Sequence, residues 1–121
     1  MLFNKNILEL ARSNNFFRKV LVTTERTQLV LMSIEVGSEI GEERHAADQI
    51  LFFVEGEGTA FINGEESPVF AGHCVVVPAG SLHNFTNKGK DPLKLFTLYA
   101  PPQHEQGEMD PTKYDAEKKE K

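Results

Sequence analysis

Short runs rich in Val, Ile, Leu, Phe and Thr follow one another along most of the chain, and this pattern limits its possible folds more than any other feature. Seven such runs occupy residues 17–25, 28–36, 49–55, 58–64, 73–78, 83–87 and 93–100. Glycine, proline and asparagine punctuate them, and Asn63-Gly64 is a strong β-hairpin signal. Because no helical pattern separates the runs, we predict an all-β, antiparallel sandwich or barrel of about seven or eight short strands.

Some of these runs are apolar on both faces. Ile50, Phe52 and Val54 alternate with Leu51 and Phe53, and alternate residues of a strand point to opposite faces. One face can line the interior of a barrel. The other face needs a second sheet, an N-terminal helix or a partner subunit to cover it, and we therefore predict a homodimer.

The two ends of the chain have a different character. Residues 4–15 are typical of a short helix, with Asn6 as its N-cap. After two consecutive prolines the chain becomes polar and ends in a charged segment, so we expect residues beyond about Gln106 to contribute little to the core. The predicted division is a helix and arm at 1–15, a barrel at 16–102 and a polar C-terminal tail at 103–121.

Charge and composition exclude several classes of partner. The formal net charge is −5, and no Lys/Arg cluster lies near aromatic residues, so we expect no nucleic-acid partner. No apolar run is long enough for a membrane helix, and the first 20 residues lack the pattern of a signal peptide, which predicts no membrane association and a cytoplasmic location. Cys74 is the only cysteine; it fits a reducing compartment, and we expect it to pack as a small buried hydrophobe.

A first group of polar residues lies just before an apolar run. Glu43, His45 and Gln49 are separated by even numbers of residues, so an extended chain places them on one wall if the intervening turn keeps register. Leu51 and Phe53 continue the same face as apolar packing. This spacing predicts a polar cluster near the mouth of an otherwise apolar barrel.

A second group follows the next valine-rich run. Pro78 ends that run because proline cannot donate to a strand ladder, and Gly80 permits a tight reversal. His83 then begins the next run, so the turn fixes where its imidazole points. Of the other two histidines that could act, we expect His73 to lie on the surface, and His104 is also more consistent with exposure than with folding back over the barrel mouth.

These two groups resemble the two sequence motifs of the cupins. The second motif is matched at each of its fixed positions: Gly72, Pro78, Gly80, His83 and Asn87. The first is matched in spacing, with altered residue types, by Gly37, Glu43, His45, Gln49 and Gly56. The resemblance extends over most of residues 17–100 and is closest to small single-domain, RmlC-like cupins likened to mannose-6-phosphate isomerase. It implies a double-stranded β-helix, or jelly-roll barrel, with a short N-terminal helix.

The resemblance also implies a metal site. Cupins hold a metal with three histidines and one glutamate; His45 and His83 match two of these histidines, while Glu43 replaces the first histidine and Gln49 replaces the glutamate. The two exchanges leave the formal ligand charge unchanged, and two imidazoles with one carboxylate form a common set for transition metals. The implied cofactor is a divalent transition metal, Mn, Fe, Ni or Zn, held by Glu43, His45, Gln49 and His83.

Other roles for these side chains remain open from the sequence. Glu43 is also consistent with a solvated surface charge, and either histidine with a hydrogen-bonded core residue. Gln49 can hydrogen-bond His45 instead of binding metal. Asp48 can replace Gln49 only after a one-residue slip, which would turn the apolar residues of the following strand outward.

The function implied by the resemblance is that of a small metal-dependent cupin enzyme, of isomerase or oxygenase type, acting on a small organic molecule. The alternative is a non-catalytic cupin that binds a sugar or another metabolite. A purely structural role is a third interpretation, if side chains fill the pocket. No Ser-His-Asp order, phosphate-binding loop or dinucleotide glycine pattern is present, and no catalytic residue is assigned.

Overall fold

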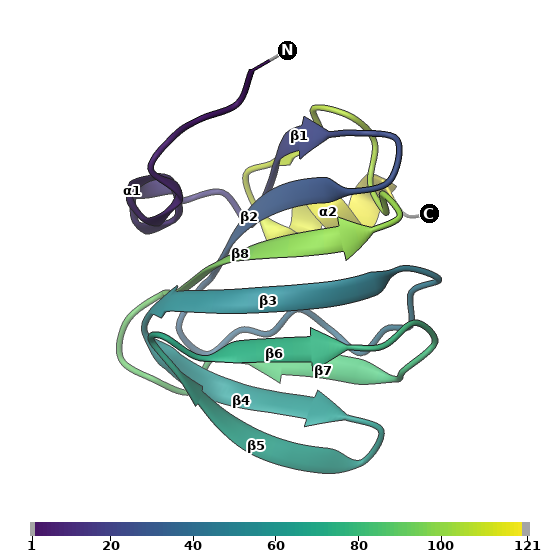
Figure 1. The fold of residues 1–121 in the computed structure, drawn as a ribbon. Helices are drawn as coiled ribbons and strands as arrows, with labels where there is room; N and C mark the ends of the chain where they lie inside the picture. The colour runs from purple at the N-terminus through teal and green to yellow at the C-terminus, as the bar shows by residue number, and fades with distance from the viewer. Residues whose placement is uncertain (1, 120–121) are drawn as a thin grey trace.

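Two antiparallel sheets form the body of the protein in the computed structural model, which describes residues 2–119 (Figure 1). The six-stranded sheet has the order β6-β3-β8-β2-β1-β9, and the three-stranded sheet has the order β5-β4-β7. The strands are β1 (Arg18–Thr23), β2 (Gln28–Ile34), β3 (Asp48–Glu55), β4 (Glu57–Ile62), β5 (Glu65–Phe70), β6 (Cys74–Val77), β7 (His83–Thr86), β8 (Leu93–Ala100) and β9 (Met109–Asp110). Two short helices, α1 (Ile7–Ser13) and α2 (Lys113–Lys119), flank them, so the predicted all-β class is confirmed.

The core lies between the two sheets. Leu51 and Phe53 of β3 are 0% and 1% exposed, and Phe85 of β7 faces them from the smaller sheet, with 5.7 Å between the ring centroids of Phe53 and Phe85. Each such side chain contributes about 1.5–3 kcal/mol through burial. The predicted alternation of β3 is therefore correct, with its odd-numbered residues inside.

The hairpin between β4 and β5 turns at Asn63-Gly64, as predicted. Both residues have positive φ angles, 48° and 85°, which a two-residue type I′ turn requires. The second strand of this hairpin, β5, is not among the runs recognised in the sequence. It lies at a sheet edge, carries Pro68 and buries only Val69, so it lacks an apolar alternation.

The predicted N-terminal helix is present as α1, shorter than residues 4–15. The Asn6 side chain caps it by accepting hydrogen bonds from two backbone N–H groups of the first turn, both at 3.1 Å. Ala11 packs with Leu31 and Val54 on the outer face of the larger sheet. The helix covers only one end of that face (Figure 1).

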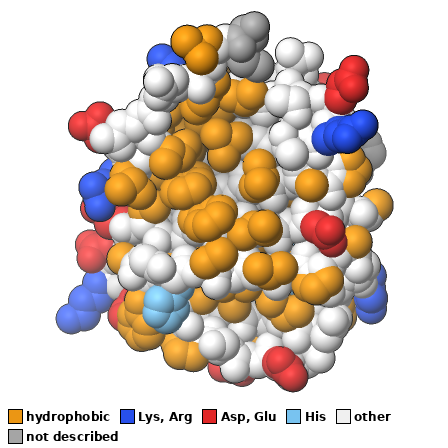
Figure 2. Space-filling model, in the orientation of Figure 1, with side chains coloured by type: hydrophobic (Ala, Val, Ile, Leu, Met, Phe, Trp, Pro, Cys, Tyr) orange, Lys and Arg blue, Asp and Glu red, His pale blue; other side chains and the backbone are white. Residues whose placement is uncertain are grey.

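The rest of that face forms an apolar surface, which we call the outer apolar face. Its side chains lie in two cross-strand rows, Val76–Ile50–Leu98–Leu29 and Cys74–Phe52–Phe96, and the second row ends at Leu31, which is buried beside α1. Figure 2 shows this continuous hydrophobic surface. Phe52 and Phe96 stack with 4.8 Å between ring centroids, and Val76 is 57% exposed. Cys74 is exposed as well, which corrects the expectation that it is buried: it lies on the outward side of an edge strand.

The C-terminal segment, residues 103–119, packs against the barrel, so the expectation that residues beyond Gln106 contribute little to the core is wrong. β9 pairs with β1, and Ala116 of α2 is 2% exposed within the main core cluster. Asp110 is fully buried and lies 3.6 Å from the Arg18 guanidinium and 2.7 Å from Lys119 Nζ. Charged residues, which carry no apolar periodicity, contribute to this attachment together with the pairing of β9 and the packing of Ala116.

Within residues 2–119, neither helix has the length and apolar character needed to cross a membrane.

Candidate metal centre

The two sequence motifs meet through the backbone. Glu43, in the loop before β3, lies opposite His83, the first residue of β7, in an isolated antiparallel bridge. Each donates its backbone N–H to the carbonyl of the other at 3.0 Å. The positions of both side chains are therefore set by strand-type pairing, which fixes their separation more firmly than a free loop does.

The turn before His83 also holds the first motif in place. Gly80, with a φ of +82°, donates its N–H to the His45 carbonyl at 2.8 Å. The N–H of Ala79 donates to Asp48 Oδ1 at 2.8 Å. Asp48 is exposed and faces this turn while Gln49 is buried, so the register slip considered from the sequence does not occur.

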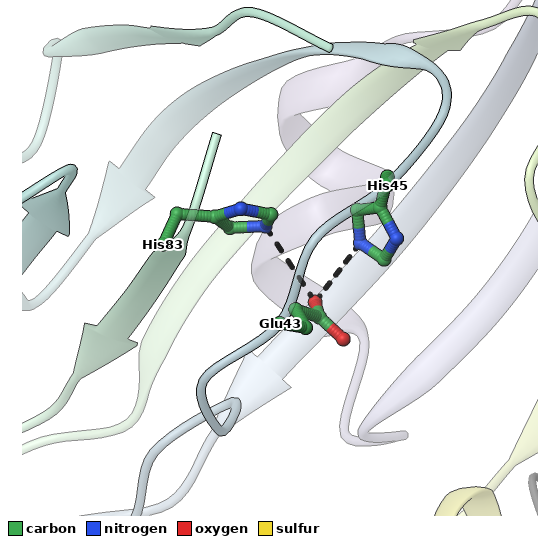
Figure 3. A group of neighbouring side chains, drawn as sticks. All are labelled: Glu43, His45 and His83. Carbon is green, nitrogen blue, oxygen red and sulfur yellow. Dashed lines mark hydrogen bonds and ion pairs between the residues drawn. The ribbon is translucent and has the colours of Figure 1, made fainter. Parts of the chain in front are cut away.

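Three polar side chains converge where these segments meet (Figure 3). Glu43 Oε1 lies 3.0 Å from His45 Nε2 and 3.8 Å from His83 Nε2. One ligand atom from each of the three residues falls within 4.8 Å of the others. We call Glu43, His45 and His83 the metal triad, since two imidazoles and a carboxylate at this separation form a plausible ligand set for a divalent transition metal.

His83 has its imidazole oriented by a second hydrogen bond. Its Nδ1–H donates to the Ser81 carbonyl at 2.8 Å, which leaves the Nε2 lone pair facing the triad. That Nε2 is buried and has no hydrogen-bond partner. Burial lowers the pKa of His83, which keeps the ring in the neutral form that binds metals.

Glu43 is held in its charged form. Burial by itself raises the pKa of Glu43, but the hydrogen bond from His45 and the nearby charge of Arg18 lower it overall. An ionised carboxylate directed at two imidazoles does not match the solvated surface charge considered from the sequence. The donor set thus fits a divalent cation in both charge and atom type.

Gln49 lies beside the triad but outside it. Its amide Nε2 donates to Thr97 Oγ1 and to the Tyr99 hydroxyl, both at 3.1 Å, rather than to His45. Its Oε1 is buried and has no hydrogen-bond partner. The role of this carbonyl oxygen as a fourth ligand stays a prediction.

His104 is the residue that the sequence analysis placed wrongly. Its ring packs edge-on against Tyr99, with 5.1 Å between ring centroids, and lies 6.4 Å from the ring of His45. Burial, together with the nearby charge of Arg18, lowers the pKa of His104 to about 3. His73, by contrast, is exposed, as predicted. Gln28 is the sequence signal for this position that was missed: it is a polar residue at the start of an apolar strand. Its side chain binds the backbone of His104.

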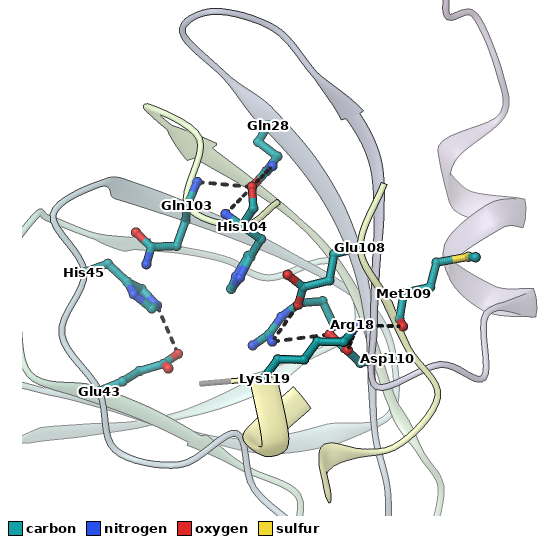
Figure 4. Close-up of polar contacts among 10 residues, drawn as sticks. All are labelled: Arg18, Gln28, Glu43, His45, Gln103, His104, Glu108, Met109, Asp110 and Lys119. Carbon is teal, nitrogen blue, oxygen red and sulfur yellow. Dashed lines mark hydrogen bonds and ion pairs between the residues drawn. The ribbon is translucent and has the colours of Figure 1, made fainter. Parts of the chain in front are cut away.

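A cavity of about 590 Å³ opens beside the triad (Figure 4). Its lining combines the loop before β3 with the C-terminal segment: Glu43, Arg44, His45, Gln103, His104, Glu105, Glu108 and Lys119. Most of these residues come from the C-terminal segment. The part of the chain that sequence reasoning treated as a tail therefore forms one wall of the candidate site.

The protein is a two-sheet antiparallel jelly roll. One carboxylate and two imidazoles converge where its two sequence motifs meet, and this is a candidate metal centre. Residues 30–99 match the family model described as a cupin domain, Cupin_2. Because the match spans more than half of the chain, the protein belongs to the cupin family, as the sequence motifs predicted.

Similar proteins agree with this assignment. An uncharacterized Bacillus subtilis protein, YrkC, is 39% identical over 94% of this chain, and the chain spans 65% of the length of that relative. The crystal structure of BH2720 from Bacillus halodurans superposes with a TM-score of 0.96 at 38% identity, covering 98% of this chain and 95% of the other. An RmlC-like cupin with a double-stranded β-helix fold from Methanocaldococcus jannaschii matches with a TM-score of 0.68 at 23% identity, over 74% of this chain and 84% of the other, which supports the fold alone.

Proposed function

We propose that the protein is a metal-dependent cupin that acts on a small organic molecule, with a divalent transition metal held by Glu43, His45 and His83. The observation that carries this proposal is the convergence of their ligand atoms within 4.8 Å. The buried and unpartnered Nε2 of His83 supports it, because buried polar atoms almost always have a partner. Gln49 Oε1 is the proposed fourth ligand.

The chemistry of the site follows from this donor set. Two imidazoles and one carboxylate leave coordination positions open, and a bound divalent ion would supply Lewis-acid polarisation of a substrate oxygen. The chain's own residues orient the ligands. Ser81 fixes the tautomer of His83, and the backbone bridge fixes the spacing of Glu43 and His83. The metal can be Mn, Fe, Ni or Zn, since the ligand types do not separate them.

The cavity supports a small-molecule substrate. Its volume of about 590 Å³ lies within the range of about 300–1,000 Å³ that is usual for small-molecule sites. Its wall carries both signs of charge, with Arg44 and Lys119 as cations and Glu105 and Glu108 as acidic groups. Such a wall suits a polar compound better than an apolar one.

A non-catalytic binding role is the second candidate, and one observation favours it. Glu43 occupies the position where the cupin motif has a histidine, and its carboxylate is hydrogen-bonded to His45 at 3.0 Å. A changed ligand set is consistent with a cupin that retains a bound ion and a ligand but performs no reaction. Ligand-dependent thermal stabilisation without any product would favour this role over the enzymatic one.

Elemental analysis of the purified protein, followed by metal titration of the metal-free form, tests the proposal. We expect about one divalent transition-metal ion per chain and saturable rebinding. Turnover of candidate substrates by the metal-loaded protein then separates the enzyme from the binding protein. Absence of any bound metal, together with no rebinding in the titration, would contradict both candidates.

We further propose a homodimer formed through the outer apolar face. Val76 is 57% exposed and continues a row of apolar side chains across neighbouring strands, whereas α1 covers only one end of this face. Light scattering should give about twice the 13.6 kDa of one chain. Val76→Lys should shift the protein toward the monomer, whereas Val36→Lys, at an exposed turn residue (52%), should not. A parent protein that is monomeric at micromolar concentration would exclude this dimer.

A further inference from the structure

We propose that His104 is a ligand-positioning residue: its imidazole forms a hydrogen bond to the small molecule bound at the metal centre. This inference rests on the proposed function, and it adds a recognition group from a part of the chain outside both cupin motifs.

The backbone at His104 is fixed by Gln28, the first residue of β2. Gln28 is 1% exposed, and its Oε1 accepts hydrogen bonds from the N–H groups of Gln103 and His104 at 3.1 and 2.9 Å. Its Nε2 donates to the His104 carbonyl at 2.7 Å. Because these contacts involve only backbone atoms of residues 103 and 104, the position of His104 does not depend on its own side chain.

The side chain of His104 carries an unsatisfied polar atom. Its Nε2 is buried and has no hydrogen-bond partner. Leaving a buried polar group without a partner costs about 1–3 kcal/mol, and such groups are rare in folded proteins. A group bound within the site can supply the missing partner.

The location of His104 identifies that group as a ligand at the metal centre. The ring lies 6.4 Å from that of His45, and both residues line the same cavity. His104 is not part of the metal triad, whose ligand atoms all lie within 4.8 Å of one another. Figure 4 shows the His104 ring on the wall that faces Glu43 and His45. A molecule that coordinates the metal from the cavity side would therefore lie beside both rings.

The charge of the centre indicates the chemical class of this molecule. A divalent ion bound by one carboxylate and two neutral imidazoles retains a net positive charge, which favours an anionic ligand. On the cavity wall the cations Arg44 and Lys119 are balanced by the carboxylates Glu105 and Glu108, so the net positive charge comes from the ion itself. The geometry points to a small oxyanion, such as a short carboxylate, that coordinates the metal with one oxygen and hydrogen-bonds His104 with another.

The test separates metal binding from oxyanion binding. Metal-free parent protein and the variants His104→Phe and His104→Gln are titrated with Ni²⁺, and the loaded proteins are then titrated with oxalate, both by calorimetry. We expect Ni²⁺ affinity to be equal within about threefold, and oxalate affinity to fall about tenfold in His104→Phe because one hydrogen bond is lost. His104→Gln should restore most of the oxalate affinity. His73→Phe is the matched control, and circular dichroism checks the folding of each variant.

Each other outcome counts against the inference in a distinct way. Equal oxalate affinity in the parent and His104→Phe overturns it, as does a parent that binds Ni²⁺ but not oxalate. A loss of Ni²⁺ affinity in both His104 variants overturns it by making His104 a metal ligand instead. Failure of the parent to bind Ni²⁺ or any other divalent transition metal overturns the proposed function as well, so the two failures are distinguishable.

Discussion

The two walls of the cavity are built in different ways. The wall formed by the two cupin motifs is fixed by backbone pairing, with reciprocal hydrogen bonds of 3.0 Å between Glu43 and His83. The opposite wall, formed by residues 103–119, has only the short backbone pairing of β9 with β1 and depends in addition on side chains: the Gln28 amide, the Arg18 guanidinium and the buried Asp110 carboxylate. The first wall should therefore tolerate changes of side chain without moving, whereas single substitutions should loosen the second.

The largest effect is expected on the backbone-paired wall. His83→Ala should abolish measurable metal binding, a loss of at least about 100-fold, because it removes an imidazole that is already oriented by Ser81. The fold should survive, since the backbone bridge to Glu43 uses no side-chain atom of His83. Metal titration of the parent and the variant, with His73→Ala as control, gives the comparison. Retention of parental affinity in His83→Ala would show that the metal triad is not the metal site.

The next effect concerns the ion pairs of the opposite wall. Asp110→Asn should lower the free energy of unfolding by about 3 kcal/mol, because it removes the buried carboxylate that faces Arg18 and Lys119. Metal affinity should change little, since Asp110 does not touch the triad. Urea unfolding and metal titration of the same samples measure both quantities. Glu108→Gln, at a carboxylate that stays partly exposed, is the matched variant with a smaller expected loss.

The Asp110 carboxylate should also make the stability of the protein depend on pH. Burial alone raises the pKa of Asp110, but its contacts with Glu108, Lys119 and Arg18 lower it overall. A lowered folded-state pKa means that this stabilisation is present above the unfolded value of about 3.9 and is lost as the pH falls through the folded value. Asp110→Asn should therefore lose less stability than the parent between pH 5 and pH 2, in urea unfolding at each pH. If the parent and Asp110→Asn lost stability equally as the pH falls, other groups would be responsible for the acid sensitivity.

A smaller effect is expected at the amide that anchors His104. Gln28→Leu should cost about 2 kcal/mol, since it leaves the backbone groups of Gln103 and His104 without their partner. Oxalate affinity of the loaded protein should fall while Ni²⁺ affinity stays near that of the parent. Thermal unfolding and the two calorimetric titrations test this. A drop in Ni²⁺ affinity instead would mean that the two walls are coupled.

The smallest effect is expected at Gln49. Gln49→Ala should weaken metal binding only about tenfold, because it removes a neutral amide oxygen and leaves the three residues of the metal triad in place. Glu43→Gln should fall between this variant and His83→Ala, because it removes the anionic ligand but keeps an oxygen donor. A loss at Gln49→Ala as large as that at His83→Ala would make Gln49 a principal ligand, and the same metal titrations decide.

The two walls also differ in how well the sequence predicted them. That Glu43, His45 and His83 lie together was predicted through the resemblance of their spacing to the two cupin motifs, and the proline-glycine turn fixes the direction of His83 locally. The apolar alternation of β3 likewise predicted its register. The docking of residues 103–119 was not predictable in the same way, because it depends on pairing between Arg18 and Asp110, far apart in the chain, and on a two-residue strand. Neither leaves a periodic pattern, and the contact of Gln28 with the backbone of His104 is likewise long-range in the sequence.

The bridge between Glu43 and His83 has a consequence for the history of the site. Since main-chain atoms hold these two positions together, residue 43 can exchange one side chain for another while the location of the site is preserved. A histidine in an ancestor and a glutamate in a descendant would begin from the same Cα position and approach the same ion. Natural selection can therefore alter the charge and the electronic character of the centre one codon at a time, on a scaffold that does not need to be rebuilt.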